Sequence, residues 1–147
     1  MLNTASAIIS FYERMEDQIA AFYDALARRY PTGREAFAAL SKESGRHKEM
    51  VVRAYREVIT DAIEAGFSFT GLDEADYRID TELKEGLSLR DALEKALAVE
   101  ESSRRFCSDA SESSRALLAD ITHAFGWVAK RKANRIERLK SLKEETS

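Results

Sequence analysis

The fold is decided by residues 12–23, which read YERMEDQIAAFY. Apolar side chains recur in this stretch at spacings of three and four, which is typical of the buried face of an α-helix. Glu16 lies on that face, four residues after Tyr12 and three before Ile19. The stretch therefore predicts a helix that directs one carboxylate toward the protein interior.

The same pattern returns later in the chain. Glu16-Asp17 followed by Phe22-Tyr23 matches Glu100-Glu101 followed by Phe106-Cys107, 84 residues further on. A repeat at a constant offset indicates a duplicated structural unit. We therefore expect two similar helical hairpins, each with an inward-pointing glutamate on its first helix.

Helix-forming residues dominate between the few breakers, which are one proline and six glycines. The breakers and caps are Pro31-Thr32-Gly33, Gly66 and Ser88. Four long helices are expected, at residues 4–30, 33–65 and 89–111, and from Ser113 or Ser114 to residue 143. Residues 67–86 lose clear periodicity and are predicted to be a long connection. The prediction is one all-α domain over residues 1–147, a four-helix bundle of two antiparallel hairpins joined by a crossover, as in ferritin-like folds.

Composition narrows the class of protein. Charged residues make up 33% of the 147 residues, but the net charge is only −3, so we expect solvated helix faces and no nucleic-acid partner. No run of 18 apolar residues or signal-peptide pattern is present, so we expect no membrane association. The lone Cys107 excludes an intramolecular disulfide and fits a reducing compartment. The expected location is the cytoplasm.

Each helix is predicted to carry polar residues on its apolar face. The second helix presents Ser44 and His47 within the row Leu40, Ser44, His47, Val51, Ala54 and Val58. The third presents Glu100 within the row Leu93, Leu97, Glu100, Arg104 and Cys107. The fourth presents two cations within the row Ile121, Phe125, Val128, Lys132, Arg135, Leu139 and Leu142. Ionised groups are costly to bury alone, so these groups are expected to pair with one another.

The motif of a glutamate followed six and seven residues later by Phe-Tyr, with its repeat, resembles the rubrerythrin family of the ferritin superfamily. The runs 40–47 and 128–139 resemble the second-helix and fourth-helix motifs of that family, so the resemblance covers nearly the whole chain. It implies a centre of two irons. Two helices would each give a Glu to that centre, and the other two would each give a Glu-x-x-His pair.

The resemblance assigns Glu16 and Glu100 to the two bridging-glutamate positions and His47 to the first histidine position. Glu43 is adjacent to the position of another ligand. A one-residue offset rotates a side chain by about 100° around the helix, so Glu43 substitutes for that ligand only if a π-bulge shifts the backbone. Glu16, His47, Glu100 and Glu43 are therefore the candidate metal ligands.

The three other family ligands are replaced in this chain. Ser44 stands where the second-helix glutamate is expected, and Lys132 and Arg135 stand at the fourth-helix Glu and His positions. An ammonium and a guanidinium would neutralise the two carboxylates and repel divalent cations. We therefore expect no metal cofactor and a buried polar network in its place, made of Glu16, Ser44, His47, Glu100, Lys132 and Arg135.

Three kinds of function follow from these expectations. The first is a non-catalytic or repurposed binding or assembly module with a structural centre. The second is an iron or manganese oxidoreductase with an incomplete or shifted centre, acting on peroxide or oxygen. The third is an acid–base or thiol enzyme that uses His47 or Cys107. The aromatic content favours a homodimer or other homo-oligomer, and a small-molecule or protein partner is left open.

Overall fold

The computed structural model describes residues 2–58, 71–114 and 119–146, and most of these residues lie in helices. It contains four long helices and one short 3₁₀ helix. They are α1 (Ala5–Arg29), α2 (Arg34–Val58), η1 (Glu74–Tyr77), α4 (Leu89–Ser114) and α5 (Ala119–Glu145). Within the described ranges the only β-type pairing is an isolated bridge between Leu2 and Leu72. The prediction of an all-α, four-helix protein is confirmed.

The first hairpin begins and ends at the expected signals. The Thr4 hydroxyl accepts a hydrogen bond from the Ala7 amide at 3.1 Å, which caps the start of α1. Gly33 has a φ of 87° in the turn to α2, and a Cβ there would lie 3.2 Å from side-chain atoms of Phe37 and Leu142. A glycine is therefore required by both backbone conformation and space. The expected end of the second helix, at residues 59–66, lies outside the described residues.

The second hairpin differs from the expectation at its turn. The Ser88 hydroxyl accepts a hydrogen bond from the Asp91 amide at 3.0 Å and caps α4, as the sequence suggests. The helix then continues through Ser114, about one turn beyond the predicted end. Ser113 and Ser114 therefore belong to the end of α4 and do not precede α5 directly. Residues 115–118, which come between the two helices, lie outside the described residues.

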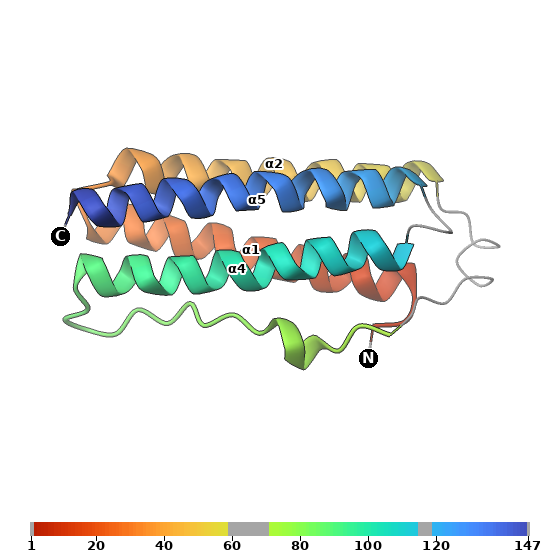
Figure 1. The fold of residues 1–147 in the computed structure, drawn as a ribbon, viewed down its shortest axis with the longest axis horizontal. Coiled ribbons are helices and arrows are strands. Elements are labelled where there is room, and N and C mark those ends of the chain that lie inside the picture. The colour runs from red at the N-terminus through yellow and green to blue at the C-terminus, as the bar shows by residue number, and fades with distance from the viewer. Residues whose placement is uncertain (1, 59–70, 115–118, 147) are drawn as a thin grey trace.

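Residues 71–88, which we call the strap, run along α1 in the same direction as that helix (Figure 1). The backbone of Leu2 pairs with that of Leu72, and further along the Tyr30 hydroxyl donates to the Leu87 carbonyl at 2.5 Å. Tyr77 packs edge-on against Phe106 of α4, with 5.3 Å between ring centroids. The strap therefore covers the groove between α1 and α4.

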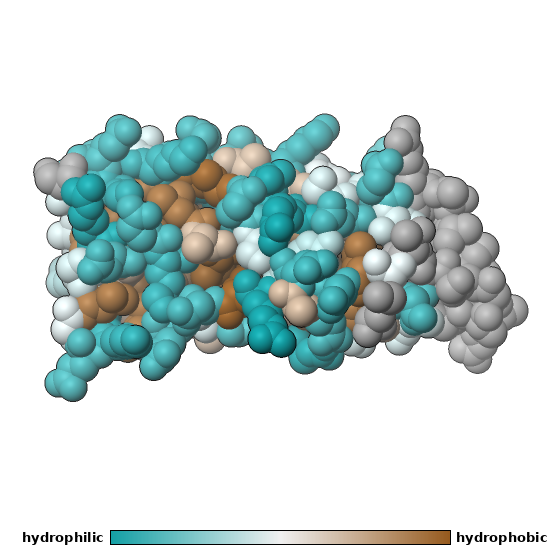
Figure 2. Space-filling view, turned by 60° about the horizontal axis from the view of Figure 1, so that its bottom comes forward, coloured by the Kyte–Doolittle hydropathy of each residue, from teal (hydrophilic) through white to brown (hydrophobic). Residues whose placement is uncertain are grey.

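The buried apolar side chains of the described helices form one core cluster, which the strap residues Leu72 and Tyr77 join. Its largest apolar members include Tyr12, Phe37, Phe106 and Phe125, all with no exposed surface. On the face that carries the strap and α4, hydrophilic side chains predominate, and the apolar side chains that show between them gather mainly in the left half of the view (Figure 2). None of the described helices has an apolar stretch long enough to cross a membrane.

Candidate functional site

In the part of the chain that the structure describes, seven polar or charged residues are buried among the apolar side chains of the bundle. They come from all four helices: Glu16 from α1, Ser44 and His47 from α2, Glu100 and Ser103 from α4, and Lys132 and Arg135 from α5. Six of them are the residues that helical spacing directs inward. Burying this many charges is tolerable only if each finds a partner.

Glu16 is held by groups from two helices. The Lys132 ammonium lies 2.9 Å from Glu16 Oε1, and the Tyr12 hydroxyl donates to Glu16 Oε2 at 2.6 Å. Burial and the neighbouring Glu16 carboxylate raise the pKa of Tyr12 well above its ordinary value. The phenol therefore stays a hydrogen-bond donor. Glu16 is paired once with a cation and once with a neutral hydroxyl.

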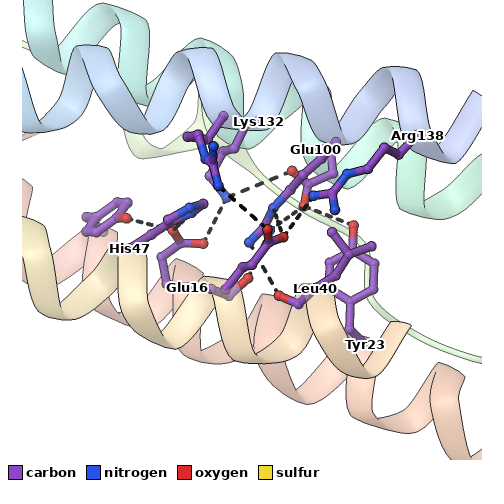
Figure 3. Close-up of polar contacts among 12 residues, drawn as sticks. Glu16, Tyr23, Leu40, His47, Glu100, Lys132 and Arg138 are labelled. Carbon is purple, nitrogen blue, oxygen red and sulfur yellow. Dashed lines mark hydrogen bonds and ion pairs between the residues drawn. The ribbon is translucent and has the colours of Figure 1, made fainter. Parts of the chain in front are cut away.

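Glu100 has the same combination of partners. Arg135 Nη1 lies 3.2 Å from Glu100 Oε1, and the Tyr23 hydroxyl donates to the same oxygen at 2.9 Å. Lys132 Nζ lies 3.9 Å from Glu100 Oε2, so it faces both glutamates. Each buried carboxylate thus has one cation and one phenol, and the Lys132 ammonium lies between the two carboxylates (Figure 3).

Arg135 ties α5 to the other hairpin. Its Nη1 donates to Ser44 Oγ at 3.0 Å, and its Nη2 donates to the Leu40 carbonyl at 3.3 Å. A guanidinium offers five N–H donors in a fixed plane, so it can serve Glu100 and α2 at once. Ser44, at the position where the resemblance predicts a glutamate, is thus a hydrogen-bond acceptor for the arginine.

Both buried cations remain charged. Burial by itself lowers the pKa of Lys132, but the attraction of Glu100 and Glu16 outweighs that effect, and the pKa is raised overall. The same holds for Arg135, whose pKa is raised because the two glutamates overcome the cost of burial. The centre of the bundle is therefore a set of compensating charges, with two fixed cations facing two carboxylates.

His47 belongs to the site but stays neutral. Burial lowers its pKa to about 3, and the positive charges of Arg135 and Lys132 add to the effect. Its Nδ1 lies 4.0 Å from Glu16 Oε2, too far for a hydrogen bond. Its ring meets the Trp127 ring edge-on, with 5.5 Å between centroids. His47 therefore joins the polar centre to the outer surface of α5.

Glu43 lies at the edge of the network and points to arginines. Its carboxylate accepts a hydrogen bond from Arg138 at 2.8 Å and lies 4.0 Å from Arg131. Arg135 Nε is 3.6 Å from the same carboxylate, which is 19% exposed. The α2 helix runs without interruption from Arg34 to Val58. No π-bulge turns Glu43 inward, and this carboxylate is engaged by three guanidinium groups.

These residues do not fit a two-metal centre. The Lys132 ammonium is within 4 Å of both central carboxylates, in the region that shared metal ions would need. Over residues 2–58, 71–114 and 119–146, no three His, Cys, Asp or Glu side chains are grouped so as to hold a metal ion. Divalent cations would also meet the repulsion of two fixed positive charges.

Spacing alone did not reveal that two buried tyrosines are hydrogen-bond donors to the site, and on α4 it missed the burial of Ser103 and misplaced Arg104. Tyr12 and Tyr23 look like apolar core residues in the sequence, yet both donate to the central glutamates. On α4 the buried row passes through Ser103, so the expected inward position of Arg104 is wrong. Arg104 is partly exposed and binds Glu101 on its own helix at 2.5 Å.

Cys107 is a core residue. Its side chain has no exposed surface, and burial raises the pKa of its thiol far above the ordinary value. The thiolate is the nucleophilic form of cysteine, so a thiol held in this state is a poor nucleophile. The geometry gives no support to catalysis by Cys107.

Comparisons with known proteins leave the family open. No protein-family model, curated protein or solved structure matches this chain significantly. The rubrerythrin resemblance therefore stays a prediction based on the motifs in the sequence.

Proposed function

We propose that this chain is a rubrerythrin-like, ferritin-type domain in which a buried ion network stands in place of the metal centre. In this proposal it is a non-catalytic or repurposed binding or assembly module. One observation carries the proposal: Lys132 and Arg135, at two of the positions where the resemblance expects metal ligands, form ion pairs with Glu16 and Glu100 in the buried middle of the bundle.

The arrangement of the chain supports the ferritin-type part of the proposal. The two helical hairpins are separated in sequence by a long segment, and its described part, residues 71–88, runs the length of α1. A connection of that length lets α2 and α4 point in the same direction (Figure 1). One long crossover between two hairpins is the connectivity of ferritin-like bundles.

The chemistry of the centre supports a structural role. The Glu16 and Glu100 carboxylates are each paired with a cation and a phenol. Among the described contacts, the neutral His47 has no hydrogen bond to a hydroxyl or thiol group. A general acid or base needs a pKa near the working pH, and burial lowers that of His47 to about 3. The interactions of these residues hold four helices together, so we place the function on the outer surface.

An iron or manganese oxidoreductase is the alternative reading. It would require Glu16, Glu43, His47 and Glu100 to converge on one ion. Glu43 instead binds Arg138 at 2.8 Å, and Lys132 separates the other two carboxylates. No contact in the described structure favours this alternative over the ion network.

Metal analysis of the purified chain tests the proposal. The protein is incubated with Fe²⁺, Mn²⁺ or Zn²⁺, freed of unbound ions, and analysed for metal content and peroxide consumption. We expect far less than one metal ion per chain and no peroxide consumption above buffer. Stoichiometric metal that is lost in Glu16→Gln and Glu100→Gln variants would contradict the proposal.

A designed variant supplies the positive control. Ser44→Glu, Lys132→Glu and Arg135→His together restore the ligand types of the Glu-x-x-His pattern and remove both cations. We expect this triple variant to take up iron where the parent chain does not. If the triple variant folds, as shown by its circular dichroism, and still binds no iron, the assignment of these positions to metal ligands is wrong.

A further inference from the structure

A cavity of about 370 Å³ lies between α1 and the strap, which run side by side (Figure 1). We call it the strap cavity. Its large apolar lining residues come from both elements and are Phe11, Met15, Tyr77 and Ile79. The hollow between α1 and α2 differs, because three basic and three acidic side chains line it and Val52 is its one apolar residue. The strap cavity therefore offers the apolar surface that sites for small organic ligands have.

The aromatic walls of the strap cavity are held in place by contacts within the chain. Phe11 and Tyr77 both pack on Phe106 of α4, with 5.0 and 5.3 Å between ring centroids. The Tyr77 hydroxyl also donates to the Asp109 carboxylate at 2.5 Å. Sites for small molecules are usually largely pre-formed, and these walls need no ligand to order them.

The strap is tied to α1 on both sides of the residues that line the cavity. Before them, the backbones of Leu2 and Leu72 exchange hydrogen bonds at 2.7 and 3.1 Å. After them, the Gln18 side-chain amide donates to the Thr81 hydroxyl at 3.1 Å. An extended peptide lying along the strap would meet these ties, so the cavity suits a compact molecule.

The lining carries one positive charge that the described residues do not balance. Arg14 lies 4.0 Å from Glu74, so these two lining charges compensate each other. The Arg78 side chain also lines the cavity, is exposed, and has no ion pair within the described part of the chain. A guanidinium matches a carboxylate in charge and geometry, because two parallel N–H groups can donate to its two oxygens.

We propose that the strap cavity binds a small organic monocarboxylate, with its apolar body against Phe11, Met15 and Ile79 and its carboxylate paired with Arg78. This inference rests on the binding role in the proposed function and names the class of ligand. One unbalanced charge fits a monoanion. The Glu74 carboxylate in the lining would repel the second charge of a phosphate, which disfavours phosphorylated ligands.

The compound 3-phenylpropanoate, a carboxylate on an apolar body, is a suitable probe. It is titrated into the ¹⁵N-labelled full chain, and the amide signals are followed by nuclear magnetic resonance. We expect saturable shifts centred on residues 11–18 and 74–79, with a Kd of about 1 mM or lower for a ligand of this size. The neutral analogue 3-phenylpropanamide should bind about tenfold more weakly, because it loses the charged bond to Arg78.

Variants of the charged residues test the role of Arg78. Arg78→Gln should weaken binding of 3-phenylpropanoate about tenfold. Glu74→Gln removes a repulsive charge and should strengthen binding about two- to fivefold. The matched control is Arg46→Gln on α2, which removes the same charge from another exposed arginine and should leave affinity within about twofold.

A variant that fills the cavity tests the location. Ala75 lines the cavity from η1 and is exposed, so a larger side chain there takes up space without disturbing the core. Ala75→Phe should weaken binding about tenfold or more, because the ring occupies part of the volume that the ligand needs. The amide spectrum of each variant shows whether it is folded.

Several results would overturn the inference. They are an absence of saturable shifts, shifts centred away from the two lining segments, equal binding of the amide, and unchanged affinity in both Arg78→Gln and Ala75→Phe. Tighter binding of phenyl phosphate than of 3-phenylpropanoate would assign the cavity to phosphates. Metal content measured on the same preparation keeps the two proposals separate, because a metal-free chain that ignores the acid contradicts only this inference.

Discussion

The ammonium of Lys132 lies 2.9 Å from Glu16 Oε1, and neither side chain has any exposed surface. The two residues belong to different hairpins, on α5 and α1. Arg135 makes the equivalent link between α5 and α2 through Ser44 and Leu40. These buried contacts therefore fix how far the two hairpins are shifted along each other. An apolar contact alone would fix that position less sharply. Whether such a network adds net stability depends on the cost of removing its charges from water.

Removal of one member of the central ion pair should be strongly destabilising. Lys132→Met leaves the Glu16 carboxylate buried beside a single phenol, and we expect a loss of about 3–5 kcal/mol in the free energy of unfolding. Adding Glu16→Gln to Lys132→Met should recover much of that loss, because no unpaired charge remains. Urea denaturation of the single and double variants measures both effects.

A surface lysine provides the control for this experiment. Lys140 lies 3.6 Å from Glu137, with more than half of each side chain exposed. Lys140→Met should change stability little, because exposed ion pairs contribute little. Equal effects of Lys132→Met and Lys140→Met would show that Lys132 is not buried in an ion pair.

The two phenols that bind the central glutamates should matter more than an ordinary tyrosine hydroxyl. Tyr12→Phe and Tyr23→Phe each remove a hydrogen bond to a buried carboxylate, which costs about 1.5–3 kcal/mol. Tyr30→Phe removes a hydrogen bond to the Leu87 carbonyl, a neutral acceptor, and should cost about 0.5–1.5 kcal/mol. Denaturation midpoints of the three variants give the order, and a larger effect at Tyr30 would contradict the network.

His47 should make folding sensitive to acid. Its pKa is about 3 in the folded chain, against an ordinary value of 6.5, because burial and nearby cations disfavour its charged form. Between pH 6.5 and about pH 3, His47 is therefore protonated in the unfolded chain but neutral in the folded chain. Stability is lost as the pH falls through that window, by up to about 1.4 kcal/mol per pH unit.

A His47→Gln variant isolates this contribution. The free energy of unfolding is measured for both chains from pH 7 down to pH 4. We expect the wild type to lose stability more steeply than the variant on the acid side of pH 6.5. Parallel curves over this range would mean that His47 takes up its proton in the folded chain.

Cys107 should react only when the chain unfolds. The thiol is fully buried and its pKa is raised, so a thiol reagent needs both an opening of the core and ionisation of the sulfur. In native buffer we expect almost no labelling of Cys107, and in denaturant rapid and complete labelling. Fast labelling of the folded chain with a thiol reagent would place Cys107 at an accessible site.

The spacing of apolar residues in the sequence was sufficient to predict the helices and most of the inward-facing polar residues, because residues three and four apart lie on one face of a helix. Glu16, Ser44, His47, Glu100, Lys132 and Arg135 all lie on such faces and are all buried. The same rule failed by one residue on α4, where the side chains of Ser103 and Arg104 lie about 100° apart around the helix and Ser103 is the buried one.

Pairing across helices could not be read from spacing. Tyr12 is four residues before Glu16, so its bond is a local one that helical geometry allows. Tyr23 and Glu100 are 77 residues apart, and nothing in either helix specifies their contact. The path of the strap was also hidden, because its hydrogen bonds to α1 depend on the packed bundle and not on its own periodicity.

Crystals of the chain soaked in Fe²⁺ and measured at the iron absorption edge test the central claim most directly. We predict no anomalous peak between the carboxylates of residues 16 and 100, and clear density for the ammonium of residue 132 in that place. An anomalous peak bound by those two carboxylates, with the lysine side chain turned away, would contradict the replacement of metal by an ion network.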